Sequence, residues 1–318
     1  MHVTVIGGAG AVGSTVAYTL ATTVPDVELR LVDVADDAAA GHATDVEHAM
    51  NHDTHEVGRS IGSHVSWGAG PVTTAEPGPD AVRDTDCLVV AYNVSRTDDA
   101  VGRGGRESYY EKNRPVADDL GDWMRGADPR PVVVVTNPVD RITDCLWRNS
   151  GWPRESFVGY SLSETARAVA EIGRIRDVDP HTVHCPMMGE HGEHLVPVFS
   201  KATVGGDPLE LSAAQRRQVL DYVRDVPYDV MRQRGAAESS RWVSGRGVAA
   251  VAHSILTGGT TAPICLSVPL AGEYGYEDVS MSVPVVLSSD GWDRIERWSL
   301  SDQERELLDA AYDHLATD

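Results

Sequence analysis

The sequence predicts an α/β protein, with a parallel sheet in residues 1–149 and a mixed α/β domain in residues 150–318. Three observations favour this division. Short β-branched runs alternate with helical patterns in the first half, as βαβ units require. A glycine-rich turn follows the first of these runs. After about residue 150 the pattern changes to longer helices, mixed with strands bounded by Gly and Pro.

The first half is expected to hold four buried strands and three helices. The strands are short apolar runs, as in sheets buried on both faces. They cover residues 2–6, 28–32, 86–91 and 131–136. The helices have apolar residues at helical spacing and cover residues 11–23, 36–50 and 107–125. Further helices are predicted in the second half, at residues 164–176, 212–234 and 244–257. Two segments rich in loop-forming residues, 68–79 and 93–105, are predicted as loops.

Length and composition place the chain among globular proteins. Its 318 residues, 42% of them apolar, can fill a sizeable core. The longest apolar runs are far shorter than the ~20 residues that cross a bilayer. The start of the chain has neither a basic head nor a small-residue cleavage site. We therefore expect a cytoplasmic protein without a membrane partner.

The charge of the chain is strongly acidic. The formal net charge is −21, and Lys112 and Lys201 are its two lysines. Such a surface repels nucleic acid, which excludes it as a partner. At molar salt the screening length falls to roughly 3 Å, so that repulsion between like charges is suppressed. An acidic chain with almost no lysine therefore predicts a halophilic protein.

The cysteines do not indicate a metal site. Cys87, Cys145, Cys185 and Cys265 occur singly, without the paired spacing of zinc ligands. They are expected to be buried thiols, and no metal is predicted.

The glycine-rich turn has the pattern G-x-G-x-x-G. Gly8, Gly10 and Gly13 follow a predicted strand, and Ala11 and Val12 begin the predicted helix. The first glycine permits a tight turn, the second lets a pyrophosphate approach the backbone, and the third lets helix and strand pack closely. This context predicts a Rossmann-type dinucleotide site.

Asp33 indicates which dinucleotide binds. It stands 20 residues beyond Gly13, at the end of the second predicted strand. A carboxylate there accepts hydrogen bonds from the ribose hydroxyls and repels a 2′-phosphate, which favours NAD over NADP.

Several further short segments are spread over nearly the whole chain. In these segments the sequence resembles the malate and lactate dehydrogenases, above all the malate dehydrogenases of salt-loving archaea. The matching segments are Gly41-x3-Asp45-x2-His48, residues 133–140 (VVVTNPVD), residues 189–193 (GEHGE), residues 196–200 (VPVFS), residues 272–278 (GEYGYED) and residues 283–285 (VPV). The resemblance implies NAD-dependent hydride transfer between NADH and a small 2-keto acid, with a cofactor domain in residues 1–149 and a substrate domain in residues 150–318. It also implies a homo-oligomer, either a dimer or a tetramer.

The same resemblance implies which residues act on the substrate. His191 would be the catalytic base, since imidazole can carry a proton near neutrality. Glu164 stands where the family has an aspartate that orients this histidine, and its longer side chain can still reach the ring. Arg167 would bind the substrate carboxylate, and Arg106 would polarise the substrate carbonyl. The remaining histidines are expected on solvated faces or in local caps.

Three more residues are implied near the nicotinamide. Asn113 follows Arg106 by seven residues, the spacing seen in the family. Thr136 and Asn137 end the fifth-strand signature, and Asn137 would contact substrate or nicotinamide. Ligands bind where parallel strands end, which agrees with this placement.

The loop that selects the substrate differs from the family. It is longer than usual between Ala91 and Arg106, and the position six residues before Arg106, where malate dehydrogenases have an arginine, is Ala100. Arg96 or Arg103 could take that role. The loss of the usual spacing slightly favours pyruvate and lactate, with oxaloacetate and malate as the alternative. A non-catalytic NAD-binding protein is the other alternative.

Overall fold

The structure is a computed structural model that describes residues 1–51, 70–94, 109–235 and 240–317. The first half of the structure, which ends with β6 at Gly159, is a parallel sheet with the strand order β3-β2-β1-β4-β5-β6. These strands are β1 (His2–Ile6), β2 (Glu28–Val32), β3 (Val72–Ala75), β4 (Cys87–Val90), β5 (Val132–Val134) and β6 (Phe157–Gly159). This is the order of a doubly wound dinucleotide-binding sheet, which confirms the predicted fold class.

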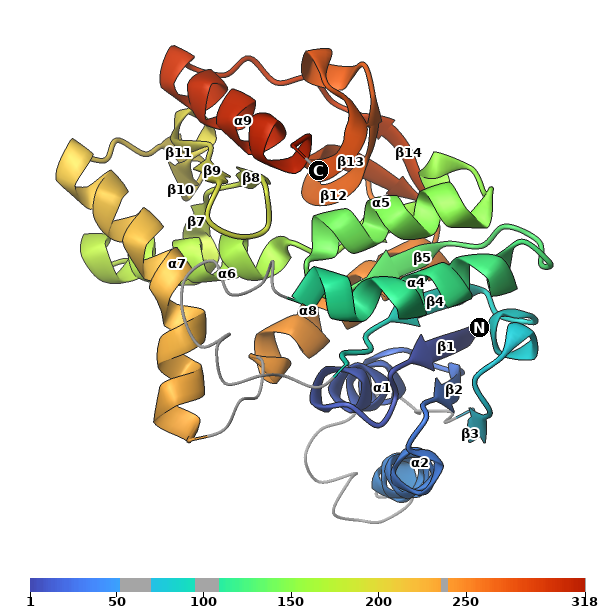
Figure 1. Cartoon of the computed structure of the whole chain (residues 1–318). Helices are drawn as coiled ribbons and strands as arrows, with labels where there is room; N and C mark the ends of the chain where they lie inside the picture. The colour runs from blue at the N-terminus through green and yellow to red at the C-terminus, as the bar shows by residue number, and fades with distance from the viewer. Residues whose placement is uncertain (52–69, 95–108, 236–239, 318) are drawn as a thin grey trace.

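Helices cover this parallel sheet, and α4 and α5 pack side by side on it (Figure 1). The helices of the first half are α1 (Ala11–Thr23), α2 (Asp36–Met50), α4 (Tyr110–Met124) and α5 (Val139–Ser150). The second half contributes α6 (Leu162–Arg176), α7 (Ala213–Arg234), α8 (Arg241–Leu256) and α9 (Asp302–Leu315). Single 3₁₀ turns lie at Pro79–Val82, Arg154–Ser156, Pro180–Thr182, Phe199–Lys201 and Glu273–Gly275.

The strands of the second half extend the same sheet in antiparallel fashion. They follow β6 in the order β12-β13-β8-β9, with β14 also paired to β13. These strands are β8 (Met187–Gly189), β9 (Leu195–Pro197), β12 (Ile264–Ala271), β13 (Glu277–Ser288) and β14 (Gly291–Ile295). A separate small sheet consists of β7 (Val183–His184), β10 (Thr203–Val204) and β11 (Asp207–Pro208).

A close contact joins the two halves where β6 meets β12. Gly159 pairs with Ser267, and a Cβ at Gly159 would lie only 2.7 Å from Thr143 Oγ1 and 2.8 Å from Ser267 Cβ. One hydrophobic cluster also spans both halves, from Val3 in β1 to Val283 in β13. Within the described residues, the large sheet and this hydrophobic cluster therefore continue from one half into the other. The predicted boundary between residues 149 and 150 stays a prediction, and β6 continues the parallel sheet beyond it.

One predicted loop is wrong in part. Residues 72–75, within the segment predicted as a loop, form β3 and pair with β2 from Leu29 to Val32. This strand is at the edge of the sheet, short and largely exposed, so it has the polar composition of a loop. The helix predicted for residues 107–125 begins at Tyr110 within the described residues.

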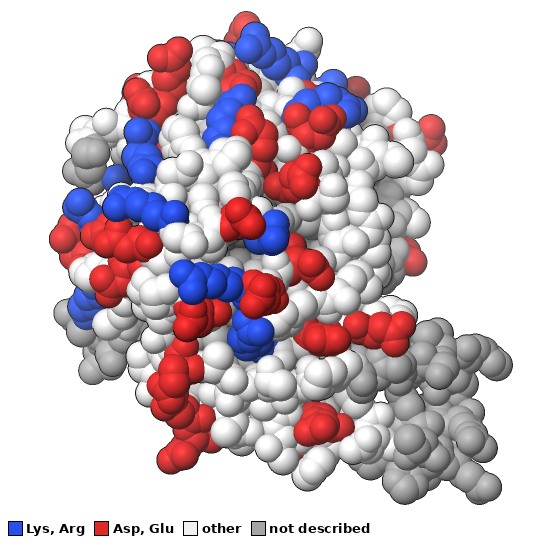
Figure 2. All heavy atoms as spheres, turned by 90° about the vertical axis from the view of Figure 1, so that its right-hand side faces the viewer, with Lys and Arg blue, Asp and Glu red and all other residues white. Residues whose placement is uncertain are grey.

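Two further properties concern the charge of the surface and the apolar length of the helices. Acidic side chains are spread over most of the face shown in Figure 2, with basic side chains lying among them. Among the described helices, none combines the length and apolar character that crossing a membrane requires.

Candidate active site

A cleft between the two halves brings several predicted residues together. It has a volume of about 730 Å³ including its open mouth. Its lining includes Val12 at the start of α1, Asn137 after β5, Arg167 on α6 and His191 after β8. Segments distant in the sequence meet here because the ends of β1, β5 and β8 lie in one continuous sheet.

The imidazole of His191 faces a buried carboxylate. Its Nδ1 lies 2.8 Å from Oε2 of Glu164, and the side chains are 9% and 2% exposed. A carboxylate beside Nδ1 favours the tautomer that carries its proton on this nitrogen and leaves Nε2 as the acceptor. The longer side chain of Glu164 therefore reaches the ring.

Glu164 also holds Arg167 on the same face of α6. Arg167 donates from Nη1 to Oε1 of Glu164 at 3.0 Å, and its side chain is 11% exposed. The spacing of three residues places both side chains over one helical turn. Glu164 thus orients a base through one oxygen and a cation through the other.

Asp140 is a functional residue that had no predicted role. Its Oδ2 accepts the backbone N–H of His191 at 2.7 Å, and the residue is 3% exposed in the first turn of α5. The contact fixes the loop that carries the histidine. Asp140 closes the fifth-strand signature, but its contact depends on where the loop after β8 meets the start of α5.

Asn113 and Thr136 hold the loops around the cleft. Asn113 is fully buried, donates from Nδ2 to the carbonyl of Asn137 at 2.7 Å and accepts the N–H of Val94 at Oδ1 at 2.9 Å. The Thr136 hydroxyl donates to the carbonyl of Tyr92 at 2.8 Å. Both residues thereby connect the segments that follow β4 and β5. Their assignment to cofactor binding stays a prediction.

The glycine-rich turn leaves the start of α1 open. Gly10 caps the helix without a side-chain hydrogen bond, and the first turn contains no acidic residue. A Cβ at Gly13 would collide with the carbonyl oxygen of Gly7, and one at Gly8 would lie 2.8 Å from Leu31 Cβ. Small residues here bring backbone and helix end together, so the turn fits a pyrophosphate.

Asp33 is fixed beside this turn at the end of β2. Its Oδ2 accepts the N–H of Ala9 and its Oδ1 the N–H of Ala35, both at 3.0 Å. The carboxylate is therefore held at the place where the first two strands of the sheet end. This position suits a ribose partner.

Several cleft residues were not predicted from the sequence. They are neutral side chains that lie on α6, α7 or α8 or next to these helices: Tyr160, Ser163, Pro227, Tyr228, Met231, Ser240 and Ser244. Burial raises the pKa of Tyr160 to about 12, so that its hydroxyl stays protonated near neutrality. It is a hydrogen-bonding group rather than a base. No motif marks these positions, because helix packing alone brings them to the cleft.

Arg96, Arg103 and Arg106 lie outside the described residues. Their predicted roles in substrate selection and carbonyl polarisation stay predictions.

Comparison with known proteins places this site in context. Residues 1–159 match the lactate/malate dehydrogenase NAD-binding domain, and residues 164–318 match the lactate/malate dehydrogenase α/β C-terminal domain. The malate dehydrogenase of Halobacterium salinarum is 32% identical, covering 99% of this chain and 97% of that protein. An L-lactate dehydrogenase of Halalkalibacterium halodurans is 28% identical, covering 95% and 91%. The structure of the malate dehydrogenase from Aeropyrum pernix has a TM-score of 0.84 at 26% identity, covering 98% and 96%.

Proposed function

Since the chain belongs to the lactate/malate dehydrogenase family and is thus an NAD-dependent dehydrogenase of 2-hydroxy acids, we propose that its preferred substrates are pyruvate and L-lactate. One observation carries the catalytic part of the proposal. The buried carboxylate of Glu164 contacts both His191 and Arg167, so that a base and a carboxylate-binding cation face one cleft.

These residues have distinct roles in the proposed mechanism. Arg167 binds the carboxylate of the substrate, for which its planar guanidinium offers two parallel donors. Nε2 of His191 takes the hydroxyl proton as the C–H bond breaks, and Glu164 stabilises the resulting imidazolium. Bound NAD⁺ supplies the acceptor for the hydride. In the reverse direction His191 returns the proton to the carbonyl oxygen.

The cofactor is assigned to residues that the first half provides. We propose that Gly8, Gly10 and Gly13, with Ala11 and Val12 at the start of α1, receive the pyrophosphate. Their support is the uncapped, uncharged first turn of α1.

The part of the cleft lined by described residues supports a substrate with a single carboxylate. Arg167 is the one Arg or Lys among the described residues that line it. Pro227, Tyr228 and Met231 add an uncharged wall from α7. A second carboxylate would need a second cation, because an unpaired buried charge is costly. The methyl group of lactate is uncharged and needs no second cation.

Oxaloacetate and malate are the second candidate pair. The support is the 32% identity with the malate dehydrogenase of Halobacterium salinarum, together with Arg96 and Arg103 as available cations. A non-catalytic NAD-binding protein is the third possibility, which the contacts of Glu164 with His191 and Arg167 oppose.

A panel of 2-keto acids tests the proposal. NADH oxidation is followed with pyruvate, 2-ketobutyrate and oxaloacetate, and the values of kcat/KM are compared. The highest value is expected with pyruvate. A higher value with oxaloacetate would assign the protein as a malate dehydrogenase, and NADH binding without any turnover would favour the non-catalytic alternative.

Asp33→Asn should shift the cofactor preference toward NADPH. The amide keeps one acceptor for the backbone contacts of Asp33 but removes the charge that repels a 2′-phosphate. We expect the NADH to NADPH ratio of kcat/KM to fall about 10- to 100-fold, as loss of a charge-assisted hydrogen bond implies. Unfolding temperatures of both proteins serve as the control. An unchanged ratio would show that Asp33 does not read the ribose.

Folding should require high salt, because the net charge of −21 is screened only there. Thermal unfolding is measured in about 0.1 M and in several-molar KCl, and a much higher Tm is expected in the latter. Sucrose at matched water activity is the control, since it acts by exclusion from the surface without screening charge. Equal stability in both KCl solutions would contradict salt adaptation.

We also infer a homo-oligomer, a dimer or tetramer, in which residues 1–149 of each chain bind the cofactor and residues 150–318 complete the substrate site. The resemblance described above supports this assembly.

A further inference from the structure

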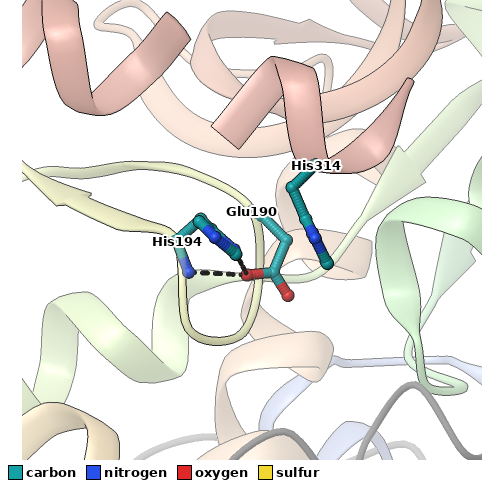
Figure 3. Close-up of side chains that lie close together, drawn as sticks. All are labelled: Glu190, His194 and His314. Atoms are coloured by element: carbon teal, nitrogen blue, oxygen red, sulfur yellow. Dashed lines mark hydrogen bonds and ion pairs between the residues drawn. The ribbon is translucent and has the colours of Figure 1, made fainter. Parts of the chain in front are cut away.

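A second cluster of side chains lies beside the catalytic loop, and the proposed reaction does not use it. Glu190 and His194 come from the loop between β8 and β9, and His314 comes from the last turn of α9. Figure 3 shows the three side chains converging from these two elements. Each offers one ligand atom, and the three atoms all lie within 4.8 Å of one another.

The carboxylate of Glu190 and the imidazole ring of His194 lie too far apart for a good hydrogen bond. Oε2 of Glu190 accepts the backbone N–H of His194 at 2.8 Å, but it lies 3.6 Å from the ring nitrogen Nδ1. That nitrogen is buried, and its ion-pair contact with Oε2 lacks hydrogen-bond geometry. A buried ring nitrogen thus faces a buried carboxylate across a gap.

A metal ion has the right size for this gap. Zinc binds imidazole nitrogen and carboxylate oxygen at about 2.0 to 2.2 Å. An ion at about 2.1 Å from both atoms would make an angle of about 120° between them, close to the tetrahedral value. The carboxylate oxygen can keep its hydrogen bond from the backbone while it binds the ion.

His314 offers a third nitrogen to the same place. Its ring stacks on that of His194 with centroids 4.3 Å apart and planes at 23°, which brings both imidazoles to the same carboxylate. A small rotation of either ring would direct its nitrogen to the ion. Two imidazoles and one carboxylate suit zinc and neighbouring transition ions, whereas magnesium and calcium prefer an all-oxygen set.

We propose that Glu190, His194 and His314 bind one zinc-like transition-metal ion. The ion would connect the end of α9 to the loop in which His191 directly follows Glu190. Its role is to hold the C-terminal helix against the catalytic loop, with a fourth position left for water. This assignment differs from the expectation that these histidines lie on solvated faces or in caps and that the chain binds no metal.

Cobalt binding tests the proposal without relying on activity. The protein is treated with a chelator, exchanged into molar KCl at about pH 8, which is above the usual pKa of a free imidazole, and titrated with Co²⁺. A visible d–d spectrum that saturates at one ion per chain is expected, and Zn²⁺ should displace it and raise the Tm. Absence of saturable binding would overturn the proposal.

Four variants locate the ion. His194→Asn and His314→Asn should each weaken Co²⁺ binding by about 10²-fold or more, as loss of one ligand implies. His181→Asn, which removes an exposed imidazole from the Pro180–Thr182 turn, should bind like the parent. His191→Asn should also retain the ion. Unfolding of each metal-free variant near the parent Tm shows that loss of binding is not loss of the fold. Parent-like binding in both ligand variants, or loss in His191→Asn alone, would place the ion elsewhere.

Discussion

Glu164→Gln should lower kcat about 10³- to 10⁴-fold, as loss of the buried carboxylate of a catalytic triad does. The amide has nearly the shape of the carboxylate but cannot stabilise an imidazolium at the 2.8 Å contact with His191. It also gives Arg167 a neutral partner in place of a charged one. The measurement is kcat with the preferred 2-keto acid at saturating NADH.

Glu164→Asp is the matched control, because it keeps the charge and shortens the side chain by one methylene. We expect substantial activity, reduced by no more than about 10²-fold, the effect of a misplacement of about 1 Å. If the Gln variant turned over at the parent rate while His191→Ala was inactive, another group would have to orient the histidine. The contact of Asp140 does not orient the imidazole, because Asp140 accepts the backbone N–H of His191.

Arg167→Met should lower kcat/KM by about 10²- to 10³-fold, mainly through KM. Truncating one partner of a buried, hydrogen-bonded charge pair costs about 2–5 kcal/mol, and the substrate carboxylate would lose that partner. Arg167→Lys keeps the charge but not the two parallel donors, so an intermediate loss is expected.

The binding of NADH separates this effect from damage to the whole site. It should change little in either Arg167 variant, because the glycine-rich turn and Asp33 lie on other elements. A parent-like KM in Arg167→Met would show that another cation binds the carboxylate. In that case the arginines at positions 96, 103 and 106 would be tested next.

The regular elements of the first half were predictable from the sequence. The strands β1 and β2 and the helices α1 and α2 have the predicted bounds, because buried parallel strands and amphipathic helices have strong patterns of apolar residues. The edge strand β3 lacks such a pattern, since both of its central threonines are exposed. It was therefore missed.

Contacts between distant segments were predictable only where a motif marked them. The resemblance pointed to Glu164 and His191, and the structure places them 2.8 Å apart. The resemblance did not predict that Asp140 would bind the backbone N–H of His191. His194 and His314 meet only because α9 packs beside β8 and β9, and no local pattern encodes that arrangement.

The continuous sheet determines how this dehydrogenase can move. Asn137 follows β5, and successive strand pairings through β6, β12 and β13 lead from there to β8 and His191. Within the described residues, a rotation of one half against the other would break the pairing of Gly159 with Ser267 and open the shared core. Backbone hydrogen bonds and a common core therefore join the described strands that carry the two sides of the cleft, so that the fold itself sets the spacing between Asn137 and His191.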